Sequence, residues 1–366
     1  MATNYNSSVV TNGLVMYYDM SNTQKSWKGA PAINLVTNPT YEANPNATGN
    51  EFVQWGDLAP IFNTYGTTGV VYSLSFDLKS KIAGPVRAYM QNGSATKYAF
   101  VNQDVNATTE YQRFTINGLS ASIQNGAETL AMLAFYGVYG TGRIASIKNV
   151  QVEINPFATP FINGTRTNTQ SVLDLTNNNT LTATSLTYDA NNTFSFNGST
   201  SIVTVPDSDN FSFPSHTFAF DYWVNFNNTT SLNGIIGKGE GSWEYAIYSN
   251  GTNGLIFYTW PVNGAGPVYT PITTTFVANQ WYHHCWTADG VNHYLYINGA
   301  LTSTAGKGVS YNMGNGSGRL TIGAAGDGGG LKYLNGKLST VKIYNRSLSA
   351  SEVSQNFNAL RGRFGI

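Results

Sequence analysis

Charged residues are scarce in this sequence of 366 residues. They make up 10% of the chain, against about 25% in an average soluble protein. The 19 basic residues balance the 19 acidic residues, so the formal net charge is zero. These numbers exclude a polybasic nucleic-acid-binding protein and an acidic disordered tail. Polarity must come from neutral side chains, and we expect no nucleic-acid partner.

Cysteine and long apolar runs are also lacking. Cys285 is the only cysteine, which excludes an internal disulfide and an all-cysteine zinc site. No stretch of the sequence approaches the about 20 apolar residues that a membrane-spanning helix needs, so we expect no membrane span. The first residues lack the basic and apolar regions of a secretory signal peptide. A nearly uncharged chain without disulfides suits the surface of a particle that is assembled in a cytosol.

Hydrophobic residues are plentiful at 41%, and aromatic residues reach 13%. This is enough apolar surface to build cores, so the chain is not intrinsically disordered. Polar and apolar residues alternate with a period of two, for example over 72–78, which is the pattern of half-buried strands. Asn298 and Gly299 follow such a stretch and predict a tight hairpin turn. The sequence therefore predicts an all-β fold.

One helix is expected, near the C-terminus. Ser349 and Glu352 have the spacing of a capping box, in which each side chain satisfies a backbone donor at the helix start. Val353, Phe357 and Leu360 then fall on one face of the predicted helix. We expect this short helix to lie on a β-sandwich.

Five ordered blocks recur in the second half of the chain, at 194–198, 217–224, 280–284, 294–299 and 336–352. Together they resemble the strand motifs of laminin-G-like, concanavalin A-type jelly rolls. Gly13–Asp19 resembles the first strand of the same family, but the next matching block, 172–179, comes only much later. We therefore expect residues 1–34 and 165–366 to form one jelly roll, with Val15 and Tyr17 beside strands from the second half.

The remaining segment, 35–164, is expected to be a domain inserted into a loop of the jelly roll. Its start at 34–39, a strand at 72–79 and its end at 147–161 resemble family 4/9-type carbohydrate-binding modules. The resemblance implies a second β-sandwich. The expected fold class is thus all-β, with two β-sandwich or jelly-roll domains, one inserted into the other, and a short C-terminal helix.

This pair of modules, with the ending 356–364, resembles the virion structural proteins of tailed bacteriophages. The resemblance implies assembly in the host cytoplasm and display on the exterior of the particle, in a tail, a fibre or the capsid surface. It also implies other virion subunits as partners, and a homo-oligomer or many copies per particle.

Catalytic chemistry is not expected. Glycoside hydrolysis needs two carboxylates about 5–10 Å apart, whereas Glu240 and Glu244 on one strand would lie about 13 Å apart. His283 and His284 are neighbours and would point to opposite faces of a strand, and nothing near His283 and Cys285 completes a metal site. The sequence contains no Gly-x-Ser-x-Gly nucleophile motif. We expect a protein that is not an enzyme and requires no cofactor.

Two kinds of ligand remain open. The family resemblance implies calcium, for which the candidate ligands are Asp207, Asp209 and Asp327, although Asp and Gly also simply make turns. Sugar binding is the activity typical of the family, and it uses aromatic platforms with neutral hydrogen-bonding partners. The aromatic candidates are Trp55, Tyr89, Tyr98, Tyr136, Tyr139, Trp243, Tyr245, Tyr258 and Trp260.

The same aromatic side chains suit a core or a subunit contact equally well. The function that the sequence favours is a non-enzymatic virion surface protein that contributes to adhesion to glycans on the host surface. The alternative is a purely structural decoration or connector protein that binds neighbouring virion subunits. A polysaccharide depolymerase is a lesser alternative, since no carboxylate pair is visible.

Overall fold

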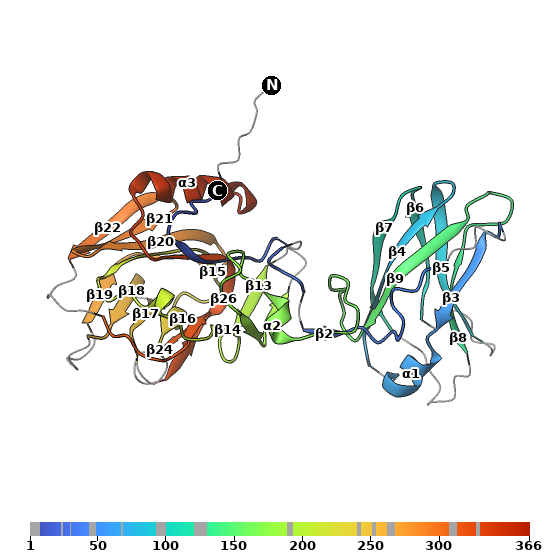
Figure 1. Cartoon of the computed structure of the whole chain (residues 1–366), viewed down its shortest axis with the longest axis horizontal. Helices are drawn as coiled ribbons and strands as arrows, with labels where there is room; N and C mark the ends of the chain where they lie inside the picture. The colour runs from blue at the N-terminus through green and yellow to red at the C-terminus, as the bar shows by residue number, and fades with distance from the viewer. Residues whose placement is uncertain are drawn as a thin grey trace, which may run out of the picture. The chain divides into compact units, whose positions relative to one another are not determined.

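The computed structural model divides into two compact units, which Figure 1 shows with the order of their elements. Unit 1 comprises residues 1–30 and 168–366, and unit 2 comprises residues 31–167. The structure describes residues 8–22, 25–29, 31–43, 49–66, 69–92, 100–120, 130–188, 193–239, 243–250, 254–261, 268–306, 313–326 and 330–366.

Two antiparallel sheets form unit 1. The first, called the β26 sheet, contains eight strands among the described residues and has the order β12-β13-β26-β15-β20-β21-β22, with β1 also paired to β26. Its strands are β1 (Leu14–Asp19), β12 (Thr187–Tyr188), β13 (Phe194–Asn197), β15 (Thr217–Phe226), β20 (Trp281–Asp289), β21 (Asn292–Ile297), β22 (Ala300–Gly306) and β26 (Asn335–Tyr344).

The second sheet of unit 1, called the β16 sheet, has the order β11-β14-β23-β16-β17-β18-β19 in the described part of the chain. Its strands are β11 (Thr182–Thr184), β14 (Ile202–Val205), β16 (Leu232–Lys238), β17 (Tyr245–Asn250), β18 (Gly254–Thr259), β19 (Val268–Ile272) and β23 (Leu320–Ile322). A short hairpin, β24 (Ala324–Gly326) and β25 (Leu331–Tyr333), contacts β16. Large aromatic side chains such as Phe218, Phe257 and Trp286 fill the core between the two sheets.

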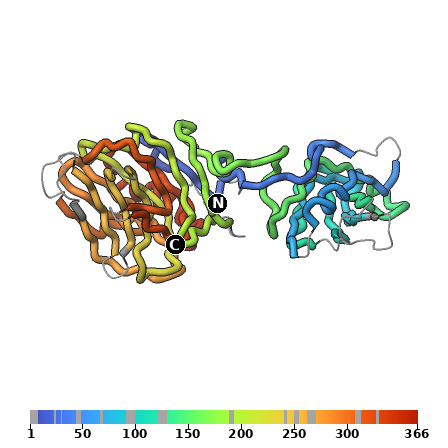
Figure 2. Tube along the Cα trace, turned by 90° about the horizontal axis from the view of Figure 1, so that it is seen from below, coloured from blue at the N-terminus to red at the C-terminus, as the bar shows by residue number. Residues whose placement is uncertain are grey.

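The chain leaves unit 1 after residue 30 and returns to it at residue 168. β1 pairs with β26, so that Tyr17 lies opposite Lys342 and Val15 belongs to the core of unit 1. The prediction that these residues lie beside strands from the second half is confirmed. The chain then passes through β2 (Ala32–Ile33) and returns through β10 (Thr165–Arg166), and these two strands pair with each other. Figure 2 shows them side by side, blue on the way out and green on the return.

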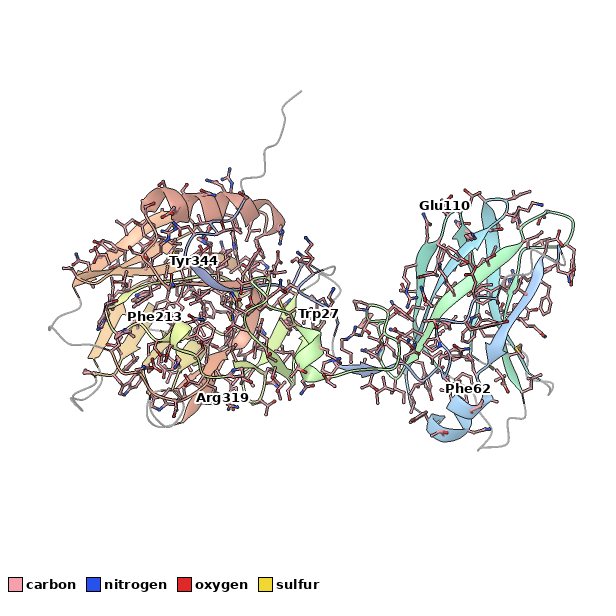
Figure 3. The ribbon with its side chains drawn as sticks, in the orientation of Figure 1. Trp27, Phe62, Glu110, Phe213, Arg319 and Tyr344 are labelled. Atoms are coloured by element: carbon pink, nitrogen blue, oxygen red, sulfur yellow. The ribbon has the colours of Figure 1, made fainter. Side chains whose placement is uncertain are left out.

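The predicted C-terminal helix is present as α3 (Ala350–Leu360), and it begins with the predicted capping box between Ser349 and Glu352. Val353 packs in a cluster with Ala219, Cys285 and Tyr344 from the outer face of the β26 sheet. Figure 3 shows Tyr344 beneath this helix. The short α2 (Asn168–Ser171) and two 3-10 helices, Asp209–Phe211 and Arg361–Arg363, complete the helical segments of unit 1 in the described residues.

Unit 2 is a smaller sandwich of two antiparallel sheets. The β5 sheet has the order β3-β8-β5-β6 and the β4 sheet the order β7-β4-β9. Their strands are β3 (Phe52–Asp57), β4 (Tyr72–Ser80), β5 (Gly84–Asn92), β6 (Asn102–Ala107), β7 (Gln112–Leu119), β8 (Ala131–Tyr136) and β9 (Ala145–Glu153). The core between them contains Leu74, Phe76 and Phe135. The two-sandwich, all-β fold class is therefore confirmed.

A helix that the sequence analysis did not expect, α1 (Ala59–Tyr65), follows β3. It has no side-chain cap, and it carries a proline in its first turn, where the missing N–H costs no hydrogen bond. Phe62 anchors it, because this ring is buried in the core of unit 2 against Tyr72 and Phe100. Figure 3 labels Phe62 above α1. No helix in the described ranges is long and apolar enough to cross a membrane.

Candidate functional site

The outer face of the β5 sheet collects aromatic side chains. Alternation along β8 sends Leu133 and Phe135 into the core, so Ala134 and Tyr136 face outward. The rings of Phe52 and Tyr89 lie 6.2 Å apart, on the two strands that flank β8. Ala134 between them is fully buried although it faces outward. The two rings therefore cover Ala134 and form an apolar surface on this face of the sheet.

Residues that pair across neighbouring strands form rows on this face, and each row contains polar as well as aromatic side chains. In one row Phe52 pairs with Tyr136, Tyr136 with Arg87, and Arg87 with Asp104. Arg87 Nε lies 2.8 Å from Asp104 Oδ1, with both side chains half exposed, and hydrogen bonding to Arg87 lowers the pKa of Asp104.

The next row runs from Gln54 through Ala134 and Tyr89 to Asn102. Gln54 and Asn102 are exposed. Aromatic rings and neutral amides thus lie in adjacent rows on the same face of the β5 sheet.

Tyr139 extends the aromatic surface from a turn that follows β8. Its side chain is 65% exposed, and its ring lies 5.2 Å from the ring of Tyr136 in an edge-on arrangement. The backbone N–H of Tyr139 donates to the hydroxyl oxygen of Tyr136 at 3.2 Å. The neighbouring Val138 has a φ of 71°, which is a strained conformation for a β-branched residue. We call Phe52, Tyr89, Tyr136 and Tyr139 the aromatic face.

Glu51 holds this turn in place. Its Oε1 accepts hydrogen bonds from the backbone N–H groups of Gly140, at 3.1 Å, and Gly142, at 3.2 Å, and its carbonyl oxygen accepts one from Gly137 at 2.8 Å. Its own backbone N–H and those of Gly142 and Gly140 keep the pKa of Glu51 below its ordinary value. The charged carboxylate therefore supports the turn that carries Tyr139. The sequence does not predict a role for either Glu51 or Phe52, because strand register brings Phe52 to this face and a turn far along the chain supplies the partners of Glu51.

Trp55 does not lie on the aromatic face. Its side chain is only 8% exposed, belongs to the core of unit 2 and lines a cavity of about 330 Å³ beside α1. None of the four aromatic-face residues lines that cavity. Tyr98 lies outside the described residues.

In unit 1, the predicted aromatic candidates separate into two groups. Tyr245 is fully buried in the core between the sheets, so it offers no ring face to a ligand and leaves the candidate set. Trp243, Tyr258 and Trp260 are partly buried, with ring centroids 6.1 Å apart for Trp243 and Trp260 and 5.9 Å apart for Tyr258 and Trp260. Trp243 also packs against Gly326, where an added Cβ would lie 1.9 Å from its ring. Tyr258 and Trp260 pack against the buried Ala246, Tyr248 and Ala325.

Asp207 and Asp209 are the two calcium candidates that lie in the described residues. Asp207 Oδ1 lies 2.7 Å from the ammonium nitrogen of Lys238, whose positive charge would repel a divalent cation. Asp209 is exposed in the first turn of a 3-10 helix, and Asp327 lies outside the described residues. Within the described ranges, no group of three His, Cys, Asp or Glu side chains could hold a metal ion.

The titratable groups considered for catalysis have structural partners. Glu244 and Lys238 form an ion pair with both side chains fully buried, and Glu240 lies outside the described residues. His283 Nε2 contacts Asp221 and His284 Nδ1 contacts Tyr222, so the two rings point to opposite faces of β20. Burial lowers the pKa of His284 to about 3 and raises that of the Cys285 thiol. Neither group is prepared for acid–base or nucleophilic chemistry near neutral pH.

Comparison with known proteins bears on unit 1. Residues 196–354 match the model of one family, described as the concanavalin A-like lectin/glucanases superfamily, Laminin_G_3. The match covers less than half of the chain and supports the predicted laminin-G-like jelly roll. No curated protein matches the sequence.

Several solved structures are similar to part of the chain. The binding domain of Paraclostridial mosquitocidal protein 1 has 20% identity and a TM-score of 0.41, over 51% of this chain and 49% of that one. The ligand-binding domain of botulinum neurotoxin serotype D, in complex with N-acetylneuraminic acid, has 15% identity and a TM-score of 0.42, over 52% and 49%.

Domain 4 of AbnA, a GH43 extracellular arabinanase from Geobacillus stearothermophilus, in complex with arabinotriose, has 17% identity and a TM-score of 0.41, over 50% of this chain and 91% of that domain. The chain spans about half the length of the two toxin domains. None of these likenesses assigns a ligand to this chain.

Proposed function

We propose that this chain is a non-catalytic glycan-binding protein and that the aromatic face of unit 2 is its contact surface. The observation that carries the proposal is the gathering of four aromatic side chains beside exposed neutral amides on one face of the β5 sheet. Sugar rings have apolar faces and many hydroxyl groups, so their binding sites combine aromatic rings with neutral hydrogen-bonding groups. Three of the four rings, Tyr89, Tyr136 and Tyr139, are residues that the sequence already favours for this role.

Binding would proceed by stacking and hydrogen bonding. Tyr139 and Tyr89 would present ring faces to a sugar, and the amides of Gln54 and Asn102 would bind its hydroxyl groups. An open face of this kind suits the middle of a glycan chain better than its end. The affinity of one site would be low, and several copies on one particle would raise it through effective concentration.

The finer part of the proposal concerns where the protein acts. The resemblance to virion proteins of tailed bacteriophages supports a place on the exterior of a phage particle, where glycan contact would serve adhesion to the host. The partners there would be other virion subunits. This part rests on the sequence resemblance alone.

A glycan array probed with the whole chain tests the proposal, with neutral and acidic glycans side by side. We expect binding to neutral oligosaccharides, and weaker binding by the variant Tyr139→Ala. A silent array together with stoichiometric binding to a capsid or tail protein would overturn the proposal in favour of a decoration or connector protein. Release of reducing ends from a bound polysaccharide would instead indicate a depolymerase.

A further inference from the structure

Unit 2 contains a cavity of about 330 Å³. It lies between the segment that precedes β3 and the helix α1, and its walls include Tyr41, Trp55 and Tyr65. This volume is at the lower end of the ~300–1,000 Å³ that small-molecule sites occupy. Tyr41 and Tyr65 are 49% and 41% exposed, whereas Trp55 is almost fully buried. The two tyrosines therefore border an opening, and Trp55 contributes to the interior.

Hydrogen bonds fix both walls of the cavity. The indole N–H of Trp55 donates to the carbonyl oxygen of Tyr41 at 3.1 Å, which ties the first wall to β3. On the other side, Asp57 Oδ1 accepts from the backbone N–H groups of Ala59, at 2.9 Å, and Ala131, at 2.8 Å. These bonds tie the start of α1 to β8. The cavity is therefore preformed, which reduces the entropy that a ligand must overcome on binding.

The charge of the lining restricts the ligand. Among the described residues that line the cavity, Asp57 is the only charged one, and none is Lys, Arg or His. An anionic ligand would meet a carboxylate with no cation in the lining to balance it. Asp57 Oδ2 accepts no hydrogen bond from the residues that the structure describes, so it is available to a hydroxyl donor. The exposed side chains of Asn38 and Thr64 also line the cavity and add neutral hydrogen-bonding groups.

From this geometry we infer that the cavity is a second sugar site, separate from the aromatic face, which takes one terminal ring of a neutral saccharide. The choice of a sugar rests on the proposed function, whereas the existence and the charge preference of the site rest on the cavity itself. Aromatic walls would contact the apolar faces of the ring, and Asp57 Oδ2 would accept a hydrogen bond from a hydroxyl group. A recessed cavity with one opening suits the end of a chain, and the open aromatic face suits its middle.

The test is NMR spectroscopy of the whole chain. It follows the indole N–H resonance of Trp55, which is assigned by its disappearance in the variant Trp55→Phe. The probes are the methyl glycosides of glucose, galactose, mannose and N-acetylglucosamine, with N-acetylneuraminic acid as the anionic comparison. We expect at least one neutral glycoside to shift the Trp55 resonance in a saturable way at millimolar concentration. N-acetylneuraminic acid should leave the resonance in place.

Two matched variants on α1 locate the binding. Thr64→Trp places a large side chain on a residue that lines the cavity and should abolish the shift. Asn63→Trp makes the same change one residue earlier, outside the lining, and should keep it. Gly56→Leu is a second filling variant, because Gly56 lines the cavity and a Cβ added there meets no atom within 4 Å. Circular dichroism confirms that each variant is folded.

The outcomes separate this inference from the proposed function. The Trp55 shift should persist in Tyr139→Ala, which alters only the aromatic face, and this would support the cavity even if the glycan array were silent. A Trp55 resonance that no neutral glycoside moves would overturn the inference, even if the array were positive. An equal shift with N-acetylneuraminic acid, or a shift that survives both filling variants, would overturn it as well.

Discussion

The ammonium nitrogen of Lys342 lies 2.6 Å from Oδ1 of Asp221, and both side chains are fully buried in unit 1. The other carboxylate oxygen, Oδ2, contacts His283 Nε2 at 3.1 Å and accepts from Asn356 Nδ2 at 3.0 Å. These contacts join three strands of the β26 sheet to α3. Burial alone would raise the pKa of Asp221, but Lys342 and His283 outweigh it, and the pKa lies below its ordinary value.

Removal of the lysine charge should therefore destabilise unit 1 strongly. In Lys342→Met, Asp221 would keep a buried charge without its main partner, and loss of one partner of a buried pair costs about 3–5 kcal/mol. The free energy of unfolding from urea denaturation measures this. Lys337→Met, on the same strand but partly exposed, is the control and should cost much less. Equal losses in the two variants would show that the pair does not stabilise the fold.

Tyr139 should contribute to glycan affinity but not to stability. Because its side chain is 65% exposed, we expect Tyr139→Ala to leave the melting temperature within a few degrees of the wild type. The loss of one stacking surface should lower the affinity for a neutral oligosaccharide about tenfold, equivalent to ~1.4 kcal/mol. Isothermal titration calorimetry measures the change.

The matched control is Phe157→Ala. Phe157 is an aromatic residue of unit 2 that is 53% exposed and lies outside the aromatic face. If both variants bind like the wild type, the aromatic face is not the site.

The fold was predictable from the sequence where local chemistry determines it. Asn298 and Gly299 both adopt positive φ, at 50° and 78°, and they connect β21 to β22 as the Asn-Gly signal indicates. Gly299 is also required by packing, since a Cβ there would lie 2.7 Å from the ring of Phe357. The capping box of α3 was equally visible. The helix α1 was not, because it lacks a side-chain cap and depends on the burial of Phe62, which is a tertiary effect.

The candidate site was only partly predictable, because strand register is not encoded locally. Tyr89, Tyr136 and Tyr139 stand out as aromatic residues, but their sequence positions do not reveal that they share a face with Phe52. The same limit applies to Tyr245. Its position in the alternating pattern is compatible with either face of β17, but its side chain lies in the core. Glu51 gives no signal at all, since its role comes from a turn that closes 90 residues later in the chain, around Gly140 and Gly142.

Glycan affinity should depend on the charge of Glu51. The pKa of this carboxyl is lowered, so the charged form and its hydrogen bonds to the turn are present at neutral pH. Because the pKa in the folded protein lies below the ordinary value of about 4.3, the support is fully present above that value. It is lost as the pH falls further, through the lowered pKa. We expect affinity for a neutral glycan to decline below about pH 4.

Two variants check that Glu51 causes this decline. Glu51→Gln removes the titrating group and weakens the turn, so its affinity should be reduced at pH 7 and should not change between pH 7 and pH 3. Asp104→Asn removes a second carboxyl, which lies beside the aromatic face, and should keep the acid sensitivity. Titration calorimetry at several pH values gives both results. If the Glu51→Gln variant retains the wild-type pH profile, the turn does not position Tyr139 for binding.

Salt should have little effect on binding at the aromatic face. Stacking and neutral hydrogen bonds are not screened by ions, whereas contacts between exposed charges weaken as the Debye length falls from about 10 Å at 0.1 M to 3 Å at 1 M salt. In the part of this face that the structure describes, the one ion pair joins Arg87 and Asp104 to each other, and their charges cancel. We therefore expect the dissociation constant for a neutral oligosaccharide, measured by surface plasmon resonance, to change less than about twofold over this range.

Arg87→Ala is the control. Asp104 becomes unpaired in this variant, yet the salt dependence should remain flat. An affinity that collapses with salt in the wild type and not in Arg87→Ala would instead identify Arg87 as the binding group and an anionic glycan as the ligand.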